Sequence, residues 1–363
     1  MIDPHVHLRD GKQSHKETVK HGLSVAYRAG LDAVFEMPNT DPALTSMKTI
    51  DDRIILADQA IEELGVKIFH GLYAGITADP KQIKEVVRAH KRLFPRVVGL
   101  KMFAGHSTGN MGIIDEDEQK SVYRTLAKLK FDGVLAVHCE KERYIEEEVW
   151  NPEFPITHCF ARGPLAEIAS VDDQIRFAQQ AGYKGTLHIC HISVPESLEY
   201  IERGRKKSDF EITCGITPHH AFLWDTIMSR LEEDGLLLKM NPPLRSKILQ
   251  DHMVRNFYDG RIDWIETDHA PHTLEEKTGK ALDGKGNPMY ASGIPVLPYY
   301  PNFIRYIEQN WLDTPQVRNL THNNIVRAFD LPKGLIPDTR REPDYNLAKE
   351  YPFDAFGLAE SVK

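Results

Sequence analysis

Histidine is the residue type that stands out in this sequence. The 363-residue chain contains seventeen histidines, and several lie beside acids or other histidines at the ends of short apolar runs. The first run ends in His5-Val6-His7. Side chains two positions apart on a strand point to the same face, so both imidazoles could reach one metal ion. On its own, the pair could also be two surface histidines.

A lysine closes the fourth apolar run, which reads VVGLK and ends at Lys101. A lysine in that position has a desolvation cost unless something compensates the charge. Its stem could be buried while its head reaches solvent at the rim. Alternatively, Lys101 has a lowered pKa and reacts with carbon dioxide. The resulting carbamate is an anionic oxygen ligand that can bridge two cations.

Two later runs carry histidines beside cysteines. His138 closes one of them, and the other contains both His188 and His191. His188 and His191 are three positions apart, so on a regular strand they face opposite ways. We expect His191, nearer the C-terminal end, to be a ligand and His188 to pack behind it. Cys139 and Cys190 are expected to point away from the site and to pack in the core.

The last apolar run leads into the segment IETDHAPH, in which Asp268 could bind metal and carry a proton. Any one of these positions could be accidental, but the ordered series across five runs indicates a metal site. The candidate ligands are His5, His7, Lys101, His138, His191 and Asp268. Nitrogen and oxygen ligands without thiolate suit zinc, with manganese or cobalt as alternatives.

These residues must be positioned by strands that end at one edge of a sheet. The expected strands are 2–7, 32–37, 66–71, 97–103, 134–138, 185–191, 210–213 and 263–268. The expected helices are 14–30, 48–65, 79–94, 115–130, 164–181, 194–207, 246–258, 301–311 and 315–329. Eight strands alternating with helices predict a parallel (β/α)8 TIM barrel over 1–330, with active-site residues at the C-terminal strand ends. An open doubly wound sheet is the alternative, although no glycine-rich phosphate motif follows a strand. From 331 to 363 we expect an extended tail packed on the barrel.

Composition narrows the class of protein. The net charge of -8 argues against nucleic acid as a partner. No apolar stretch approaches the ~18 residues of a membrane span, and no basic and then apolar leader is visible. The four cysteines form no Cys-x-x-Cys pair, which favours reduced thiols. We therefore expect a cytoplasmic protein that acts on a small molecule.

The ordered ligand set resembles that of the amidohydrolase superfamily, and within it the sequence is similar to the dihydroorotases over roughly residues 2–335. The resemblance is carried by DPHVHLR, MPNT, GLK, HCE, HIS, KMNPPLR and DHAPH. The most specific features are DHAPH and Arg9, because hydantoinase substrates lack the carboxylate that Arg9 would bind. Many relatives begin with a β-rich segment that is not seen here, so we expect little or no accessory β-sandwich.

The resemblance implies two divalent metal ions, best fitted by Zn²⁺. His5, His7, carbamylated Lys101 and Asp268 would hold one ion, while Lys101, His138 and His191 would hold the other. The implied reaction is the reversible cyclisation of N-carbamoyl-L-aspartate to L-dihydroorotate in pyrimidine biosynthesis. Metal-bound hydroxide would be the nucleophile in the hydrolytic direction, with Asp268 as general acid and base.

Substrate recognition is implied for four further residues. Arg9, Asn39 and His272 would grip the substrate carboxylate, and Asn241 would read the ring amide. Arg245 could be a substrate contact or a surface ion-pair residue. The alternative functions are a hydantoinase, dihydropyrimidinase or allantoinase-like hydrolase, or an inactive barrel that binds aspartate transcarbamoylase. A homodimer, or association with aspartate transcarbamoylase, is also compatible with the resemblance.

Overall fold

The structure is a computed structural model that describes residues 1–106 and 111–363. Its eight strands are parallel and pair in chain order. They are β1 (Ile2–Val6), β2 (Ala33–Glu36), β3 (Phe69–Gly75), β4 (Val97–Ala104), β5 (Val134–Cys139), β6 (Thr186–Ile189), β7 (Ile212–Ile216) and β8 (Trp264–Ile265). Every strand that the structure describes belongs to this sheet.

The first and last strands meet and close the sheet into a barrel. Val6 forms a parallel bridge with His269, and the His7 amide donates to the His269 carbonyl at 2.8 Å. The buried Asp3 carboxylate accepts hydrogen bonds from the backbone and side chain of Thr267, at 3.0 and 2.6 Å. These contacts confirm the predicted (β/α)8 barrel and exclude the open doubly wound sheet.

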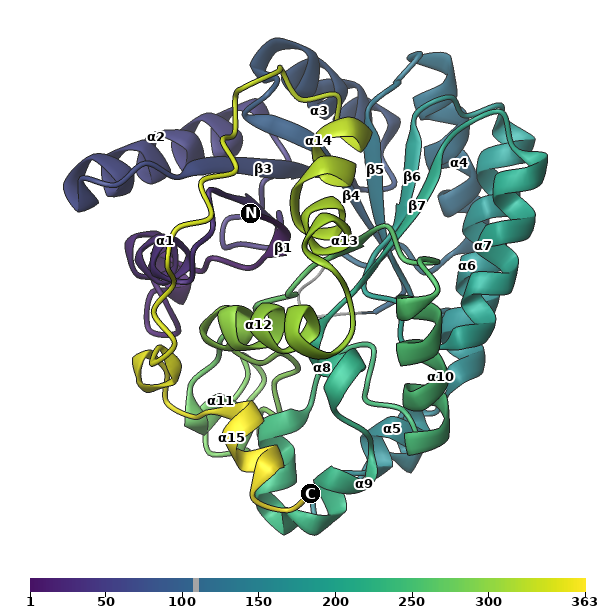
Figure 1. The fold of residues 1–363 in the computed structure, drawn as a ribbon. Helices are drawn as coiled ribbons and strands as arrows, with labels where there is room; N and C mark the ends of the chain where they lie inside the picture. The colour runs from purple at the N-terminus through teal and green to yellow at the C-terminus, as the bar shows by residue number, and fades with distance from the viewer. Residues whose placement is uncertain (107–110) are drawn as a thin grey trace.

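Helices surround the strands (Figure 1). The long helices that follow successive strands are α1 (Val19–Arg28), α2 (Met47–Leu64), α3 (Pro80–Leu93), α4 (Glu116–Lys128), α6 (Pro164–Ala181), α7 (Pro195–Lys207) and α10 (Lys247–Tyr258). After β8 come α12 (Tyr300–Asn310), α13 (Thr314–Arg318), a π-helical turn (Asn319–Asn323) and α14 (Asn324–Ala328). The shorter helices are α5 (Thr157–Ala161), α8 (Pro218–Phe222), α9 (Thr226–Arg230), α11 (Leu274–Lys277) and α15 (Ala355–Glu360).

Local capping explains where the helices depart from the expected ranges. The helix expected from residue 14 begins at Val19, because Thr18 adopts an extended backbone and accepts the His21 amide at 3.1 Å. The single helix expected over 315–329 is divided by the π-helical turn. The tail was expected to be extended throughout, but Asp354 caps α15 within it.

Apolar packing occurs on both faces of the sheet. On β6, Leu187 and Ile189 join the outer core between the strands and the helices. Inside the barrel, Phe329 contacts Phe35, Tyr73 and Trp264 through ring centroids 5.2, 6.1 and 5.8 Å away. Each fully buried aromatic side chain contributes on the order of 1.5–3 kcal/mol of transfer free energy. This packing makes the barrel a rigid support for the residues at its rim.

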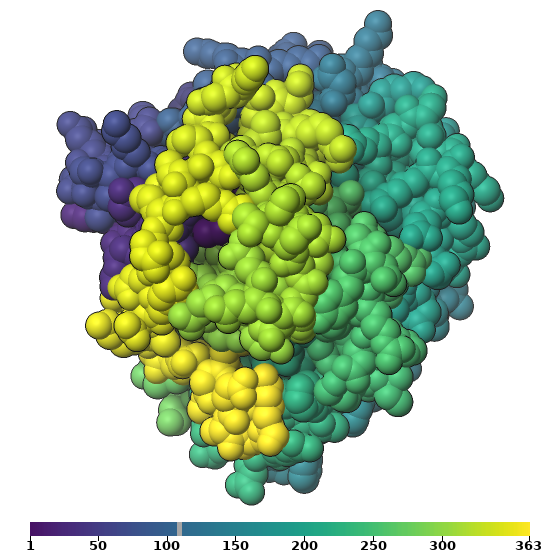
Figure 2. Space-filling model, in the orientation of Figure 1, coloured from purple at the N-terminus to yellow at the C-terminus, as the bar shows by residue number. Residues whose placement is uncertain are grey.

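Residues 331–363 cross the barrel beside its N-terminal segment (Figure 2). Arg341 pairs with Asp32, and Arg28 of α1 pairs with Asp344. The Tyr351 hydroxyl donates to Glu17 at 2.5 Å. The division into a barrel over 1–330 and a separate tail stays a prediction. No helix in the described ranges is long and apolar enough to cross a membrane.

Candidate active site

A small polar pocket lies among the residues that follow the C-terminal ends of the strands. Its walls are formed by His5, His7, Arg9, Asn39, Phe103, His138, His191, Asn241, Asp268, Ala270, Ser292 and Gly293. Eight of the ten residues predicted from the sequence are in this set. The other two adjoin it: Lys101 is fully buried, and His272 contacts Arg9. The inner pocket has a volume of about 20 Å³, enough for water or a small ion but not for a ring.

One half of the pocket is formed by β1 and the segment after β8. The Asp268 carboxylate oxygen Oδ1 lies 3.2 Å from His5 Nε2 and 2.9 Å from His7 Nε2. The ligand atoms of these three residues all lie within 4.8 Å of one another, which is a spacing that could hold a metal ion. The expected convergence of the His-x-His pair with Asp268 is therefore present in the fold.

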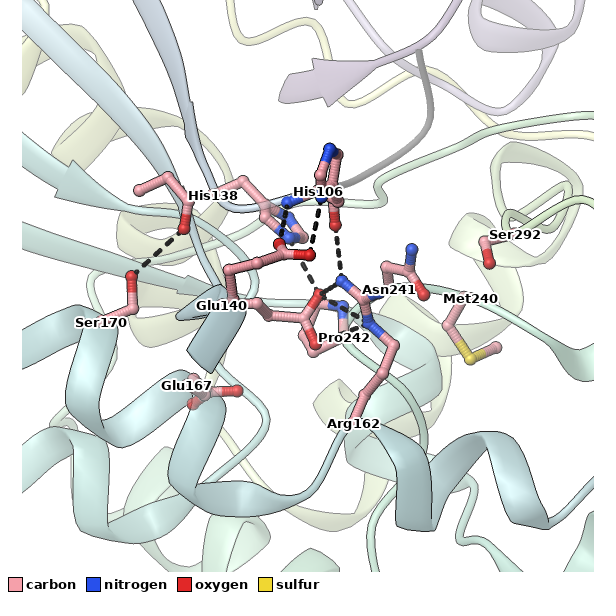
Figure 3. A network of polar contacts seen from close by, with 12 residues as sticks. His106, His138, Glu140, Arg162, Glu167, Ser170, Met240, Asn241, Pro242 and Ser292 are labelled. Atoms are coloured by element: carbon pink, nitrogen blue, oxygen red, sulfur yellow. Dashed lines mark hydrogen bonds and ion pairs between the residues drawn. The ribbon is translucent and has the colours of Figure 1, made fainter. Parts of the chain in front are cut away.

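The other half contains the two remaining histidines. His138 Nδ1 and His191 Nε2 face each other at 3.2 Å. His138 Nε2 contacts the Glu140 carboxylate at 3.0 Å, and Arg162 donates to that carboxylate through Nε and through a terminal nitrogen 2.7 Å away (Figure 3). A carboxylate on the far nitrogen of a histidine orients the ring and makes it a better ligand.

The structure corrects the expected direction of Cys190. His188 and Cys190 face the barrel interior, while Leu187 and Ile189 pack outside it, so the strand parity assigned to His191 was wrong. His191 enters the site because β6 ends at Ile189 and His191 has a left-handed backbone, with φ of 34°. Cys190 consequently lies beside the site instead of pointing away from it.

Lys101 lies behind the histidine pairs, on β4. Its side chain is fully buried, and Nζ donates to Cys190 Sγ at 3.1 Å. Within the described residues, no carboxylate pairs with this amine, and its hydrogen-bond partner is the Cys190 thiol, whose pKa burial would raise but Lys101 lowers to about 5. The rim-exposed reading of Lys101 is therefore wrong, because no part of the side chain reaches solvent.

Two backbone positions in the site are strained. His191 and Asp268 have φ of 34° and 49°, a left-handed region that costs non-glycine residues on the order of 1 kcal/mol or more. Strain of this kind persists where surrounding contacts hold it, and it clusters at functional sites. Here the His191 amide is held by Glu266, whose carboxylate also contacts His188 at 3.0 Å.

The Glu266 carboxylate requires a glycine on the neighbouring strand. A Cβ built on Gly215 of β7 would lie 2.5 Å from the Glu266 carboxyl carbon. Glu266 also accepts the Trp264 indole N–H at 3.2 Å, and His188 stacks on that ring. His188 thus packs behind the candidate ligands.

Charge in the buried site fits a cation. Burial alone would raise the pKa of Asp268, but His5 and His7 hold it well below its usual value. Burial lowers the pKa of His7 to about 4 and that of His191 well below its usual value, so both imidazoles are neutral, as metal ligands must be. His5 Nδ1 is buried without a hydrogen-bond partner. Burial would lower the pKa of His5, but Asp268 raises it well above its usual value, so a metal ion bound here would replace the proton on that imidazole. An ionised carboxylate and two neutral imidazoles together fit a divalent metal.

Arg9 also lines the pocket and is only 2% exposed. Its Nε donates to the Pro271 carbonyl at 3.2 Å, and a terminal nitrogen donates to His272 Nε2 at 3.2 Å. His272 in turn contacts Glu276 through Nδ1 at 3.0 Å. Desolvation lowers the pKa of Arg9 to about 10, which leaves the group charged at neutral pH. Arg9 is therefore a buried cation whose described side-chain hydrogen bonds go to neutral groups.

The two predicted asparagines line the pocket through different contacts. Asn39 Oδ1 lies 2.7 Å from His7 Nδ1, an orienting contact that the sequence did not predict. Asn241 Oδ1 lies 3.0 Å from His158 Nε2. Arg245, left open from the sequence, donates to Ser193 Oγ at 2.9 Å and pairs with Glu167 at 3.7 Å. It is an ion-pair residue, but it is buried and does not lie on the surface.

Sequence reasoning assigned no role to Glu140 or Glu266. A signal for both was available, because Glu140 shares strand parity with His138, and Glu266 shares it with Asp268. Arg162 gave no such signal, since it follows helix α5 and lies 22 residues after Glu140 in the chain.

Comparisons with known proteins add independent evidence. No family model matches the chain. The chain is 36% identical to a dihydroorotase of Thermococcus kodakarensis over 97% of this chain and 71% of that protein. It is 31% identical to a dihydroorotase of Halobacterium salinarum, covering 98% of this chain and 76% of the relative.

Solved structures show the same fold at lower identity. An L-hydantoinase from Arthrobacter aurescens superposes with a TM-score of 0.77 at 19% identity, covering 91% of this chain and 70% of that one. A dihydroorotase from Campylobacter jejuni gives a TM-score of 0.66 at 17% identity, covering 92% and 84%. These structures share the fold, and the two curated relatives show that the chain belongs to the dihydroorotase family of cyclic amidohydrolases.

Proposed function

We propose that this protein catalyses the reversible cyclisation of N-carbamoyl-L-aspartate to L-dihydroorotate. The observation that carries the proposal is Arg9, a buried guanidinium that lines the same pocket as the histidines and Asp268. Its described side-chain partners are neutral, so its charge is available for an anion. Dihydroorotate carries one carboxylate on its ring, and a guanidinium binds a carboxylate through two parallel hydrogen bonds.

Two divalent cations, best fitted by Zn²⁺, complete the proposed site. His5, His7 and Asp268 would hold one ion, and His138 and His191 the other. Lys101, carbamylated by carbon dioxide, would bridge them. Its buried amine, which no carboxylate pairs with in the described structure, is supporting evidence, because a carbamate at this position supplies an anionic oxygen ligand. When bound, such ions lower the pKa of water and polarise the ring carbonyl.

Asp268 is the proposed proton carrier. During hydrolysis its carboxylate accepts the proton of the attacking water and passes it to the departing ring nitrogen. In the cyclising direction it takes the proton from the ureido nitrogen and passes it to the hydroxyl of the protonated carboxyl group, which leaves as water. Its contacts with His5 and His7 keep it ionised and fix its orientation.

The substrate would be oriented by the rim of the pocket. Arg9 binds the carboxylate, and His272 holds the guanidinium in place through its own contact with Glu276. Asn39 and Asn241 both line the pocket and would contact the carboxylate and the ring amide. A ring needs more room than the inner pocket offers, and the larger adjoining cavity, which shares Asn241 and Ser292, supplies it.

The alternative functions are weaker. A hydantoinase, dihydropyrimidinase or allantoinase-like activity shares the fold, but it gives Arg9 no carboxylate to bind. An inactive partner of aspartate transcarbamoylase is disfavoured because every expected ligand is present. A homodimer, association with aspartate transcarbamoylase and a cytoplasmic location stay predictions.

One experiment tests the function directly. The purified protein is analysed for metal content and assayed with carbamoyl-aspartate, dihydroorotate, dihydrouracil, hydantoin and allantoin. We expect close to two metals per chain and turnover of the first two compounds only. Efficient hydrolysis of dihydrouracil or hydantoin would replace the proposal with a broader cyclic amidase.

A further inference from the structure

A second cavity adjoins the inner pocket on its solvent side. Its volume is about 330 Å³, and it shares Asn241 and Ser292 with the inner pocket. Arg162, drawn beside Asn241 in Figure 3, also lines the outer cavity. The outer cavity is therefore large enough for a small organic acid and lies beside the proposed reaction centre.

A buried lysine lines this outer cavity. Lys239 is only 9% exposed, and its Nζ donates to the Tyr290 carbonyl at 2.8 Å and to Ser292 Oγ at 2.7 Å. The same Nζ lies 5.4 Å from the centre of the Trp150 ring. Desolvation, reinforced by the charge of Arg162, lowers the pKa of Lys239 to about 8, so the side chain is mostly protonated at pH 7.

No acid in the described structure pairs with Lys239. Glu147 is the one acid among the described residues of the cavity wall; it is 67% exposed and pairs with Arg162 at 3.5 Å. The other two cations of the wall have partners, Lys16 with Glu276 at 3.0 Å and Arg162 with Glu140 at 2.7 Å. Among these described cations of the cavity wall, Lys239 is the one that has no acidic partner.

A second buried lysine lies behind Lys239, and burial, reinforced by the charge of Lys239, holds the pKa of Lys277 well below its usual value. Lys277 is fully buried and donates to the carbonyls of Lys239 and Gly293 at 2.7 and 2.9 Å. Its described contacts are also neutral. Burying a charge without an ionic partner costs free energy, and that cost is reduced when an anion binds.

We propose that the outer cavity is a second carboxylate-binding subsite, in which Lys239 receives the dianionic open-chain substrate before it reaches Arg9. This inference rests on the proposed function. N-carbamoyl-aspartate has two carboxylates, so one can contact Lys239 while the other leads into the inner pocket. Asn241 and Ser292, which line both spaces, mark the passage between the subsites.

Trp150 provides a signal for the test, because it lines the outer cavity beside Lys239. The protein as purified is titrated with succinate, an unreactive four-carbon dicarboxylate, while tryptophan emission is recorded. Neutral succinamide is the matched ligand control, and Trp150→Phe identifies the part of the signal that comes from the cavity. We expect succinate to change the Trp150 emission and succinamide to leave it unchanged.

Variants then assign the binding to Lys239. Loss of a charge-assisted hydrogen bond predicts about ten- to a hundredfold weaker succinate binding in Lys239→Gln. Lys239→Arg should retain binding, and Arg9→Met should retain the Trp150 signal because Arg9 belongs to the inner subsite. Lys184→Gln, which removes an exposed lysine paired with Asp209, is the control for loss of charge alone.

Several results would overturn the inference. They are an equal response to succinamide, no Trp150 response in the parent protein, unchanged binding in Lys239→Gln, or loss of the signal in Arg9→Met. If Lys239→Gln does not fold, two measurements still test the inference. They are the comparison of succinate with succinamide and the binding of succinate to Lys239→Arg. Failure of the proposed function is seen separately, as no cyclisation of carbamoyl-aspartate, because the titration needs no turnover.

Discussion

Replacing Arg9 with methionine tests the link between the structure and substrate choice. Methionine keeps most of the apolar stem but removes the guanidinium, which is 2% exposed and lines the inner pocket. No metal-site residue accepts a described side-chain hydrogen bond from Arg9, whose partners are the Pro271 carbonyl and His272. Metal content should therefore stay at the parent level.

The expected effect follows from one lost charge-assisted interaction. Such a bond contributes roughly 1.5–3 kcal/mol, so kcat/KM for dihydroorotate should fall about ten- to a hundredfold. Dihydrouracil has no carboxylate and loses nothing, so the preference for dihydroorotate over it should shrink by the same factor. Arg9→Lys keeps the charge without the two-pronged geometry and should lie between the parent and Arg9→Met.

The assay follows ring opening of both compounds at fixed pH, with metal analysis on each variant. The cyclising and hydrolysing values of kcat/KM must fall by one common factor, because an enzyme does not change the equilibrium constant. The reasoning is refuted if Arg9→Met retains its metal and still prefers dihydroorotate as strongly as the parent. The carboxylate would then be held elsewhere, and Lys239 would be the next candidate.

Four further outcomes are expected. Lys101→Ala should lose most of its bound metal and its activity, with partial recovery when a short carboxylic acid is added; full metal content with a normal rate would contradict the carbamate. Asp268→Asn should lower kcat by about 10²–10⁴-fold while substrate still binds, and a change of only a few-fold would reassign the proton carrier. Glu140→Gln should weaken metal binding about 10–100-fold in a chelator competition, since the amide orients His138 less firmly, whereas unchanged affinity would make Glu140 structural only. Burial alone would raise the pKa of Glu17, but neighbouring histidines and a tyrosine lower it to about 2, so its stabilisation is present above pH 4.5 and is lost as the pH falls towards 2. The free energy of unfolding, measured with urea, should depend less on pH over that interval in Glu17→Gln than in the parent protein. Parallel pH curves for the two proteins would argue against a stabilising role for the Glu17 carboxylate.

Much of the site could be predicted from strand periodicity alone. His5 and His7 share a face because side chains alternate along a strand, and parallel strands bring their C-terminal ends to one rim. Asp268 meets His5 at that rim, at 3.2 Å, although the two are separated by most of the chain. Local patterns therefore determined which residue types would meet and at which end of the barrel.

Strand periodicity predicted side-chain directions wrongly where a strand, here β6, ended before the apolar run in the sequence did. The parity argument placed His191 with Leu187 and Ile189, but β6 ends at Ile189 and the left-handed backbone at His191 turns that side chain into the site. Cys190, still following the strand alternation, faces the barrel interior beside Lys101. A backbone angle of this kind is held by a tertiary contact, here from Glu266 to the His191 amide.

By itself, the sequence determined the barrel, the order of the ligands and the presence of Arg9 beside them, since each depends on alternation and spacing along the chain. Only the tertiary structure decided which of the buried charged side chains have a partner of opposite charge. Arg162 reaches Glu140 across the rim, whereas Lys239 and Arg9 are buried among neutral described partners. Whether a buried charge has a counter-ion depends on distances between segments far apart in the chain, and the response of that charge to an anion depends on the same distances.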